Sequence, residues 1–274
     1  MNYGPLIEIM DGFKPRTDIS HAIFDFDGTL SWLRHGWPQM MADMFLEQYP
    51  LQPGETREQA YAFLMDELLS LNGNLTIFQM IRFGEHLRER GAPVPDPEAL
   101  RVEYQRRLDH HIALNTEAIR AGCAKTDAYV VHGARLMLDK LQQRGIDLII
   151  LSGTPVEFVR REAELLGLAG YFSPHIYGGT GDLMKYSKKE VMERIIREEQ
   201  IQGEHIISFG DGPVEIRFTK ELGGLAVAVC SDEAVNGSGK VDPFKRKQLL
   251  AAGADAVIAD YREPDQLIKF LWGK

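Results

Sequence analysis

The chain of 274 residues has little cysteine, no long apolar run and no long run of charges of one sign. Its two cysteines, Cys123 and Cys230, are too few and too far apart for a zinc site or a disulfide framework, so we expect buried, reduced thiols. No apolar run approaches the roughly 20 residues that span a membrane, and the first 16 residues lack the apolar centre of a signal peptide. We therefore expect a cytoplasmic protein without a membrane partner.

The charge of the chain argues against a nucleic-acid partner. The formal net charge is −9, whereas electrostatic binding to nucleic acid needs clustered Lys and Arg. The aromatic residues are scattered without a basic frame, so a stacking platform for bases is not expected either. Hydrophobic residues make up 44% of the chain, which is enough to bury a substantial core. Composition thus predicts a globular protein with one large or two small domains.

Short apolar runs that end in small or acidic residues recur along the chain. They cover residues 22–24, 146–151, 205–209, 225–229 and 256–258. Runs that are apolar on both faces are typical of buried parallel strands, and helical patterns lie between them. This alternation predicts a doubly wound α/β sheet, in which ligands bind beyond the carboxyl ends of the strands.

Residues 31–126 show helical stripes but no convincing strand. One apolar stripe consists of Tyr61, Leu64, Met65, Leu68 and Leu69, and another of Ile77, Met80, Ile81 and Leu87. We interpret both stripes as core packing. The sequence therefore predicts an all-helical domain over residues 31–126, inserted between the first two strands of a sheet domain that comprises residues 1–30 and 127–274.

The strongest signal is the run Asp25-Phe26-Asp27-Gly28-Thr29. Residues two apart on a strand point the same way, so Asp25 and Asp27 can share a face. Two adjacent carboxylates need a cation, and oxygen ligands suit Mg²⁺. An EF-hand loop also begins with Asp-x-Asp, but its final Glu position falls here on Gly36 and no helix precedes it. Taken alone, the motif could also be a strand end with solvated acids.

Polar groups follow two further predicted strands. The run Ser152-Gly153-Thr154 follows a strand and forms a strand-to-helix turn, where a hydroxyl and free backbone N–H groups can hold a phosphoryl oxygen. Asp211 follows the next strand and can complete the metal site, and Glu215 can hold the metal ligands in place without binding the metal itself. These positions predict a phosphate and metal site at the carboxyl edge of the sheet.

Lys188 is the candidate for neutralising an aspartate nucleophile and a phosphoryl oxygen. Lys185 is its competitor, and neighbouring lysines such as Lys188 and Lys189 are otherwise typical of a solvated surface. We favour Lys188 because it directly precedes a helical stripe, which anchors its backbone close to the carboxyl edge of the sheet.

The order of these motifs resembles the haloacid dehalogenase superfamily, which has DxDGT, a Ser or Thr after a strand, a Lys and an acidic GD motif. The resemblance covers the whole chain, and residues 31–126 match the position of the family's helical cap. It implies that Asp25 is the nucleophile, that Asp27 is the general acid and base, and that Lys188 stabilises charge. It also implies phosphate binding by Thr29, Ser152, Gly153 and Lys188, and Mg²⁺ binding by Asp25, Asp27 and Asp211. Where many relatives have Asp, this chain has Glu215.

Specificity is expected in the helical domain, because the core motifs treat every phosphoryl group alike. Arg34 lies shortly after Asp27, and its guanidinium can pair with sugar hydroxyls or a second anion. Trp32 and Trp37 could add an apolar wall; alternatively, Arg34 is a surface charge and both tryptophans pack the hinge. Residues 31–37, 176–178 and 210–215 also resemble uncharacterised family members found beside sugar kinases, which hints at a sugar phosphate.

The resemblance implies a Mg²⁺-dependent phosphatase that hydrolyses a small phosphorylated metabolite through an aspartyl phosphate on Asp25. A phosphomutase of the same fold is the main alternative. Dehalogenase chemistry fits less well because it uses neither Asp27 nor a metal. A non-enzymatic phospho-acceptor or binding module is more remote, since receiver domains are about half this length and lack a large helical insertion.

Overall fold

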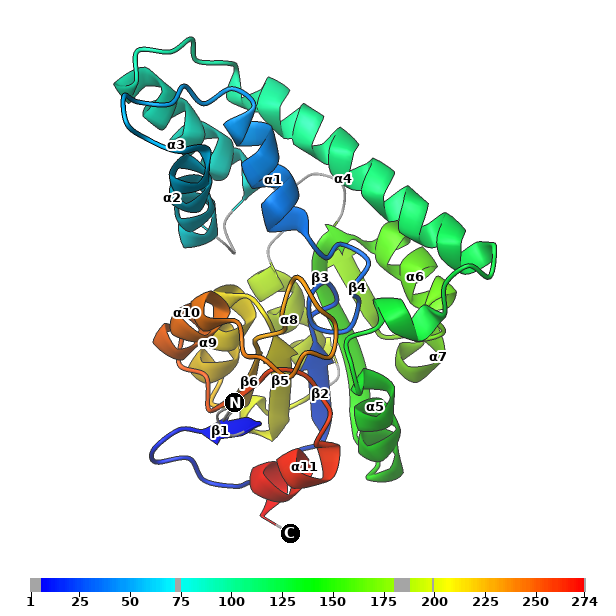
Figure 1. Ribbon diagram of the computed structural model, residues 1–274. Helices are drawn as coiled ribbons and strands as arrows, with labels where there is room; N and C mark the ends of the chain where they lie inside the picture. The colour runs from blue at the N-terminus through cyan, green and yellow to red at the C-terminus, as the bar shows by residue number, and fades with distance from the viewer. Residues whose placement is uncertain (1–5, 72–74, 180–187, 199, 274) are drawn as a thin grey trace. The chain divides into compact units, whose positions relative to one another are not determined.

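The computed structural model describes residues 6–71, 75–179, 188–198 and 200–273 (Figure 1). It divides into two compact units, one made of Met1–Leu33 with Ile119–Lys274 and the other of Arg34–Ala118. We call them the core unit and the helical unit. The division of the sequence into domains at residues 31 and 126 stays a prediction.

A seven-stranded sheet forms the centre of the core unit, in the order β1-β7-β6-β5-β2-β3-β4. Its strands are β1 (Ile7–Ile9), β2 (His21–Phe24), β3 (Asp147–Pro155), β4 (Ile176–Gly179), β5 (Ile206–Gly210), β6 (Leu225–Val229) and β7 (Ala256–Ile258). All neighbouring pairs are parallel except β1 and β7, which pair antiparallel at one edge. The predicted α/β class is confirmed, with an antiparallel edge strand added to an otherwise parallel sheet.

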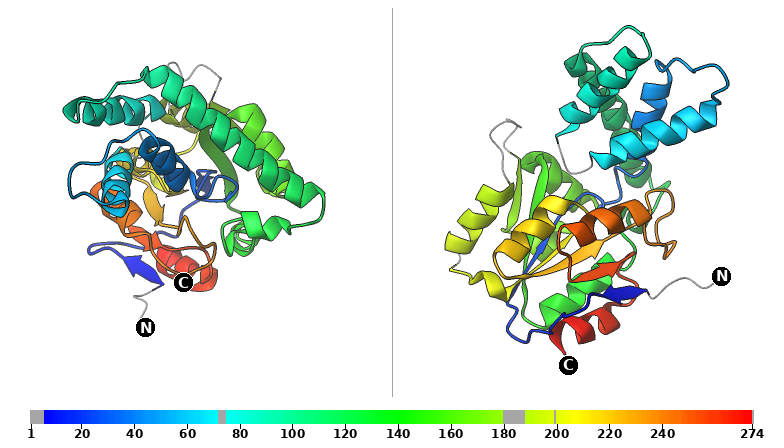
Figure 2. Two further views of the ribbon diagram at one scale, coloured as in Figure 1. Left: turned by 45° about the horizontal axis from the view of Figure 1, so that its top comes forward. Right: turned by 90° about the vertical axis from the view of Figure 1, so that its left-hand side faces the viewer.

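Helices cover both faces of this sheet (Figure 2). The helices of the core unit are α5 (Ala134–Gln143), α6 (Val156–Leu165), α7 (Ala169–Phe172), α8 (Lys188–Glu198), α9 (Pro213–Glu221), α10 (Pro243–Ala251) and α11 (Pro264–Trp272). On β2, Phe24 packs with residues of α5, α6 and α11, whereas its neighbour Ile23 packs with residues of α8 and α9. Because successive side chains point to opposite faces, a strand buried on both sides has to be apolar throughout.

Three motif-bearing strands lie side by side in the order β5-β2-β3. Phe24 at the end of β2 is in register with Phe209 of β5 and with Ile150 of β3. The backbone N–H of Asp25 donates to the carbonyl oxygen of Phe209 at 2.9 Å. The residues that follow these strands are therefore brought to one edge of the sheet, as the sequence predicts.

The helical unit has its own hydrophobic core. It is built from α1 (Trp37–Leu46), α2 (Arg57–Ser70), α3 (Thr76–Glu89) and most of α4 (Pro97–Arg120). Leu64 and Leu68 of one predicted stripe and Met80 and Leu87 of the other are buried in this core. Ile81 is exposed, so its assignment to the packed stripe was wrong.

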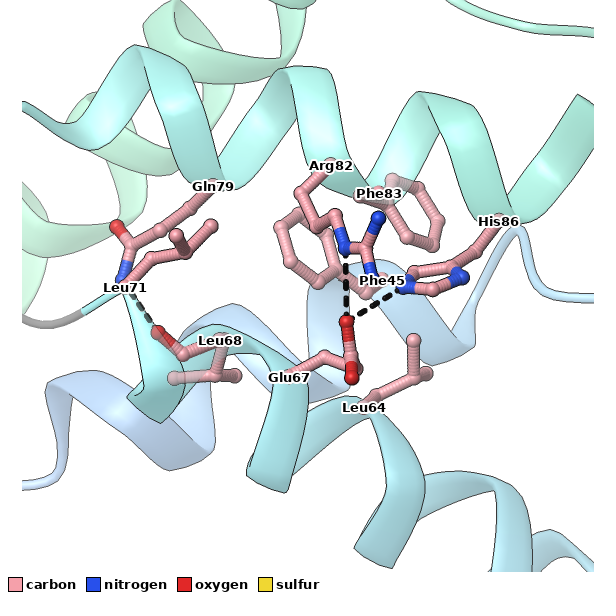
Figure 3. Close-up of a pocket in the computed structure, with 9 residues that line it drawn as sticks. All are labelled: Phe45, Leu64, Glu67, Leu68, Leu71, Gln79, Arg82, Phe83 and His86. Carbon is pink, nitrogen blue, oxygen red and sulfur yellow. Dashed lines mark hydrogen bonds and ion pairs between the residues drawn. The ribbon is translucent and has the colours of Figure 1, made fainter.

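A polar cluster joins α2 to α3 beside a small pocket (Figure 3). Arg82 Nε donates to Glu67 Oε2 at 2.9 Å, and His86 Nε2 lies 2.8 Å from the same oxygen. Partial burial alone would raise the pKa of Glu67, but its hydrogen bonds with His86 and Arg82 hold that pKa below its usual value. Gln79 Nε2 donates to the carbonyl oxygen of Leu68 at 3.0 Å. These contacts link the two helices.

Cys230 is buried, as expected, but Cys123 is exposed, so the prediction of two buried thiols was wrong for Cys123. Cys123 follows the C-terminal end of α4 in a turn that leaves its side chain in solvent. Among the helices of the described residues, none is long and apolar enough to cross a membrane.

Candidate active site

Gly28 lets the chain turn sharply after the two aspartates. Its φ of 73° lies in the left-handed region that favours glycine. A Cβ atom at this position would lie 2.2 Å from Asp211 Oδ2, closer than two atoms can approach. A glycine at position 28 thus allows the loop after β2 to pass directly over the carboxylate that follows β5.

Three carboxylates gather at this edge of the sheet. One oxygen each from Asp25, Asp211 and Glu215 lies within 4.8 Å of the others. Burial raises the pKa of Asp25 well above its usual value, although the charge of Lys188 opposes this rise. Burial likewise raises the pKa of Asp211 to about 6. Three carboxylates held this close together form a site that a hard cation would stabilise, and their oxygen donors suit Mg²⁺.

Glu215 belongs to this carboxylate group although the sequence suggested only a supporting place behind it. It lies in the first turn of α9, where its Oε1 accepts from the backbone N–H of Gly212 at 2.8 Å. A Cβ atom on Gly210 would come within 2.7 Å of the same oxygen, so the glycine leaves room for the carboxylate. The longer side chain thus reaches the same cluster as Asp25 and Asp211.

Lys188, the first residue of α8, lies where the sequence analysis expects it. Its Nζ is 3.0 Å from Asp25 Oδ1 and 3.3 Å from Glu215 Oε2. Burial alone would lower the pKa of Lys188, but the two carboxylates more than offset this effect and raise it. The side chain is therefore a positive charge held against the proposed nucleophile. The competing Lys185 lies outside the described residues.

The C-terminal end of β3 contains a hydroxyl group to which the sequence analysis gave no role. Thr154 Oγ1 donates to Asp27 Oδ2 at 2.8 Å. Ser152 is almost fully buried, and its Oγ accepts from the backbone N–H of Thr154 at 3.1 Å, while Gly153 is exposed. The two-residue spacing from Ser152 was the signal that could have identified Thr154, since such residues on a strand point the same way.

Two predicted site residues lie apart from these contacts. Thr29 is fully buried, and its hydroxyl has no hydrogen-bond partner among the described residues. Arg34 is half-buried and begins the helical unit. Trp32 packs in the core unit and Trp37 against the core of the helical unit. The contacts predicted for Thr29 and Arg34 with a substrate, and for Asp27 with a metal, stay predictions.

Sequence reasoning missed a second lysine at the site. Lys245 of α10 is buried, and its Nζ lies 3.0 Å from Asp211 Oδ2 and 2.5 Å from Glu233 Oε1. Burial alone would lower the pKa of Lys245, but Glu233 and Asp211 more than offset this effect and raise it. No local signal distinguishes Lys245 from the other basic residues of its helix, because its partners come from other parts of the chain.

Several solved structures share this fold. A predicted phosphoglycolate phosphatase from Haemophilus somnus is 14% identical, with a TM-score of 0.58 over 92% of this chain and 98% of that one. A haloacid dehalogenase family hydrolase from Deinococcus radiodurans, with bound phosphate and sodium, is 15% identical, with a TM-score of 0.60 over 93% and 96%. A protein assigned as a β-phosphoglucomutase from Bacteroides vulgatus is 15% identical, with a TM-score of 0.56 over 94% and 90%.

A search of curated proteins finds no match to the chain. The family model of the haloacid dehalogenase-like hydrolases, in contrast, matches residues 19–223, which include Asp25, Ser152, Lys188 and Asp211. This match covers most of the sequence and agrees with the fold of the core unit. The chain therefore belongs to the haloacid dehalogenase-like hydrolase family.

Proposed function

We propose that this hydrolase is a Mg²⁺-dependent phosphatase that acts on a small phosphorylated metabolite through an aspartyl phosphate on Asp25. The observation that carries the proposal is the position of Asp25, 3.0 Å from the ammonium group of Lys188 and within 4.8 Å of carboxylate oxygens of Asp211 and Glu215. A carboxylate beside both a fixed positive charge and a set of cation ligands is suited to attack an anionic phosphate. The fold neighbours described as phosphatases agree with this chemistry.

Asp25 is oriented for attack by two donors on one oxygen. Its Oδ1 accepts from the backbone N–H of Phe26 at 2.8 Å and lies 3.0 Å from Lys188 Nζ. Asp25, Asp211 and Glu215 would hold Mg²⁺, which when bound offsets negative charge on the carboxylates and the phosphoryl group. Lys188 adds a second positive charge on the side of Asp25 and Glu215. This arrangement lowers the repulsion between the nucleophile and the substrate.

Asp27 is suited to move the proton in both half-reactions. In the first, Asp25 forms a bond to phosphorus, the bond from phosphorus to the leaving oxygen breaks, and Asp27 gives that oxygen its proton. In the second, Asp27 takes a proton from water, the water oxygen bonds to phosphorus, and inorganic phosphate leaves Asp25 as a carboxylate. Thr154 Oγ1 donates to Asp27 Oδ2 at 2.8 Å, which orients this carboxyl group.

A phosphomutase is the second candidate function, because one neighbour of the same fold is assigned as a β-phosphoglucomutase. In a mutase, the phosphoryl group on Asp25 returns to a sugar rather than to water. A mutase would need a bisphosphate activator and would release little free phosphate. Measuring free phosphate from a panel of phosphorylated metabolites therefore separates the two candidates.

The proposal is tested with a generic aryl phosphate in the presence of Mg²⁺. We expect turnover with Mg²⁺, loss of turnover in excess chelator, and loss of turnover in Asp25→Asn, because the amide cannot form the acyl phosphate. Undiminished activity in excess chelator would show that the carboxylate cluster is not a catalytic metal site. Undiminished activity of Asp25→Asn would exclude Asp25 as the nucleophile.

A further inference from the structure

Lys245 occupies a place where a lysine is rarely found. It lies in the first turn of α10, whose N-terminus is capped by Asp242, and its side chain is only 5% exposed. A lysine is almost never buried unless its charge is paired, because removing an ammonium group from water is costly. The groups that surround Lys245 therefore decide what it does.

Three acceptors surround the ammonium group of Lys245. They are Glu233 Oε1 at 2.5 Å, Asp211 Oδ2 at 3.0 Å and Ser231 Oγ at 3.2 Å. An ammonium group has three N–H donors, so the three contacts satisfy it completely. Lys245 is thus held by its own partners and needs no other ligand.

Ser231 connects this group to the loop that carries the proposed nucleophile. Its hydroxyl donates to the carbonyl oxygen of Gly28 at 2.8 Å while accepting from Lys245. Ser231 follows β6, Asp211 follows β5 and Gly28 follows β2, and these three strands are neighbours in the sheet. The network therefore joins the ends of three strands around the carboxylate of Asp211.

The two buried lysines divide the acids of the site between them. Lys188 contacts Asp25 and Glu215, whereas Lys245 contacts Asp211 and Glu233. Lys245 is not placed against the proposed nucleophile, and Glu233 does not belong to the carboxylate group that would hold Mg²⁺. Lys245 nevertheless contacts Asp211, one of the carboxylates that would hold Mg²⁺, and Glu233 in turn contacts Lys245.

We propose that Lys245 and Glu233 form a buried charge pair that sets the cation affinity of the Asp25, Asp211 and Glu215 site. Lys245 acts here as a positioning residue: it fixes Asp211 and reduces the negative potential that the carboxylates present. Glu233 offsets the repulsion between Lys245 and a bound cation. This inference rests on the metal site of the proposed function, but it makes a separate prediction about the sign of each change.

Changing either partner alone should shift the affinity for Mg²⁺ in opposite directions. Lys245→Met removes a positive charge beside Asp211, so Mg²⁺ should bind about tenfold more tightly or better. Glu233→Gln removes one of the two carboxylates that offset the charge of Lys245, so Mg²⁺ should bind about tenfold more weakly or worse. Removing one charge near a buried divalent ion changes its binding free energy strongly, because water screens the interaction only weakly there. This change should exceed the effect of losing one hydrogen bond to Lys245 or Glu233.

The double variant and two further controls complete the experiment. Lys245→Met with Glu233→Gln restores the net charge of the pair, so its affinity should return to within about threefold of the unchanged protein. Lys245→Arg keeps the charge and should stay close to the unchanged protein. Lys247→Met, on an exposed position of the same helix, should leave the affinity unchanged.

The measurement is the dissociation constant of Mg²⁺ for the full chain without substrate, obtained by calorimetry and from the rise of Tm with Mg²⁺ concentration. Opposite shifts for Lys245→Met and Glu233→Gln support the charge pair. Weaker binding in both single variants would overturn it and leave Lys245 with only a structural role. If Lys245→Met does not fold, unchanged binding in Glu233→Gln would still overturn it. Absence of Mg²⁺ binding to the unchanged protein would instead refute the metal site of the proposed function.

Discussion

The contact between Lys188 and Asp25 gives the sharpest prediction about turnover. Lys188→Met removes the ammonium group 3.0 Å from Asp25 Oδ1 and 3.3 Å from Glu215 Oε2. Both carboxylates are then left buried without that positive charge, with side chains only 10% and 6% exposed. Burial raises the pKa of Asp25, and the charge of Lys188 limits that rise. Without Lys188 the pKa of Asp25 should rise further. Asp25 should then be protonated more often and attack phosphorus less often.

The size of the loss follows from the number of charged contacts. A hydrogen bond to a charged group contributes about 1.5–3 kcal/mol, which corresponds to roughly 10- to 150-fold in rate. Because Lys188 contacts two carboxylates, we expect kcat on an aryl phosphate to fall by about a hundredfold or more in Lys188→Met. Removing one partner from a buried ion pair also destabilises a protein by about 3–5 kcal/mol. The Tm of Lys188→Met is therefore measured in parallel, so that kcat is calculated for the folded protein alone.

Lys189 provides a matched control on the same helix. The side chain of Lys189 is 54% exposed, and its Nζ lies 3.4 Å from Glu221 Oε2. Lys189 pairs with Glu221, which does not belong to the carboxylate group. An exposed ion pair also adds at most about 1 kcal/mol to stability, so Lys189→Met should change kcat by less than about threefold. A kcat in Lys188→Met within threefold of the unchanged protein would refute the role of Lys188. A larger loss in Lys185→Ala than in Lys188→Met would assign that role to Lys185.

Three other changes test separate parts of the account. Thr154→Val should slow hydrolysis of the phosphoenzyme by about tenfold but should not slow its formation from an activated aryl phosphate, so a rapid-mixing experiment should show a burst of product. Equal slowing of both steps, or failure of Thr154→Ser to restore hydrolysis, would show that the hydrogen bond from Thr154 does not orient Asp27. Arg34→Ala should lower kcat/KM for the physiological substrate by about tenfold or more, but should hardly change it for a small aryl phosphate; equal losses would place Arg34 in general phosphate binding. Because the folded pKa of Glu67 lies below its usual value of 4.5, its stabilising effect is present above that pH and is lost as pH falls through the folded pKa. Glu67→Gln should therefore lower the free energy of unfolding by about 1 kcal/mol at pH 7, and this loss should shrink steadily as pH falls below 4.5. A loss that does not change with pH would show that the charge of Glu67 does not matter.

The parts of the structure that follow local sequence rules were predictable. The run that ends at Phe24 is apolar throughout because both of its faces are buried, and this property is visible in the sequence alone. Asp25 and Asp211 follow two such runs, so their meeting at one edge of the sheet could be expected once the strands were taken as neighbours. Lys188 was favoured over Lys185 because it precedes a helical stripe, and its Nζ lies 3.0 Å from Asp25 Oδ1; its role in catalysis stays a prediction.

The parts that depend on distant partners were not predictable from local patterns. Thr154 bonds to Asp27 across 127 residues. Its spacing from Ser152 predicts that the two side chains point the same way, but this spacing does not indicate Asp27 as the partner. Lys245 stands directly before Arg246 and Lys247 in the sequence, and its charge is buried because Asp211 and Glu233 compensate it. The antiparallel edge strand β1 is three residues long, which is too short for a periodic signal.

The most direct test of the central claim is to trap the phosphoenzyme. Asp27→Asn should still be phosphorylated by an activated aryl phosphate in the presence of Mg²⁺, because a good leaving group needs little protonation, but should lose its phosphoryl group slowly without the base that activates water. Peptide mapping by mass spectrometry would then locate the group. We predict a single acyl phosphate on Asp25, absent from the Asp25→Asn, Asp27→Asn double variant. A phosphoryl group on any other residue, or release of free phosphate with none trapped, would contradict the account.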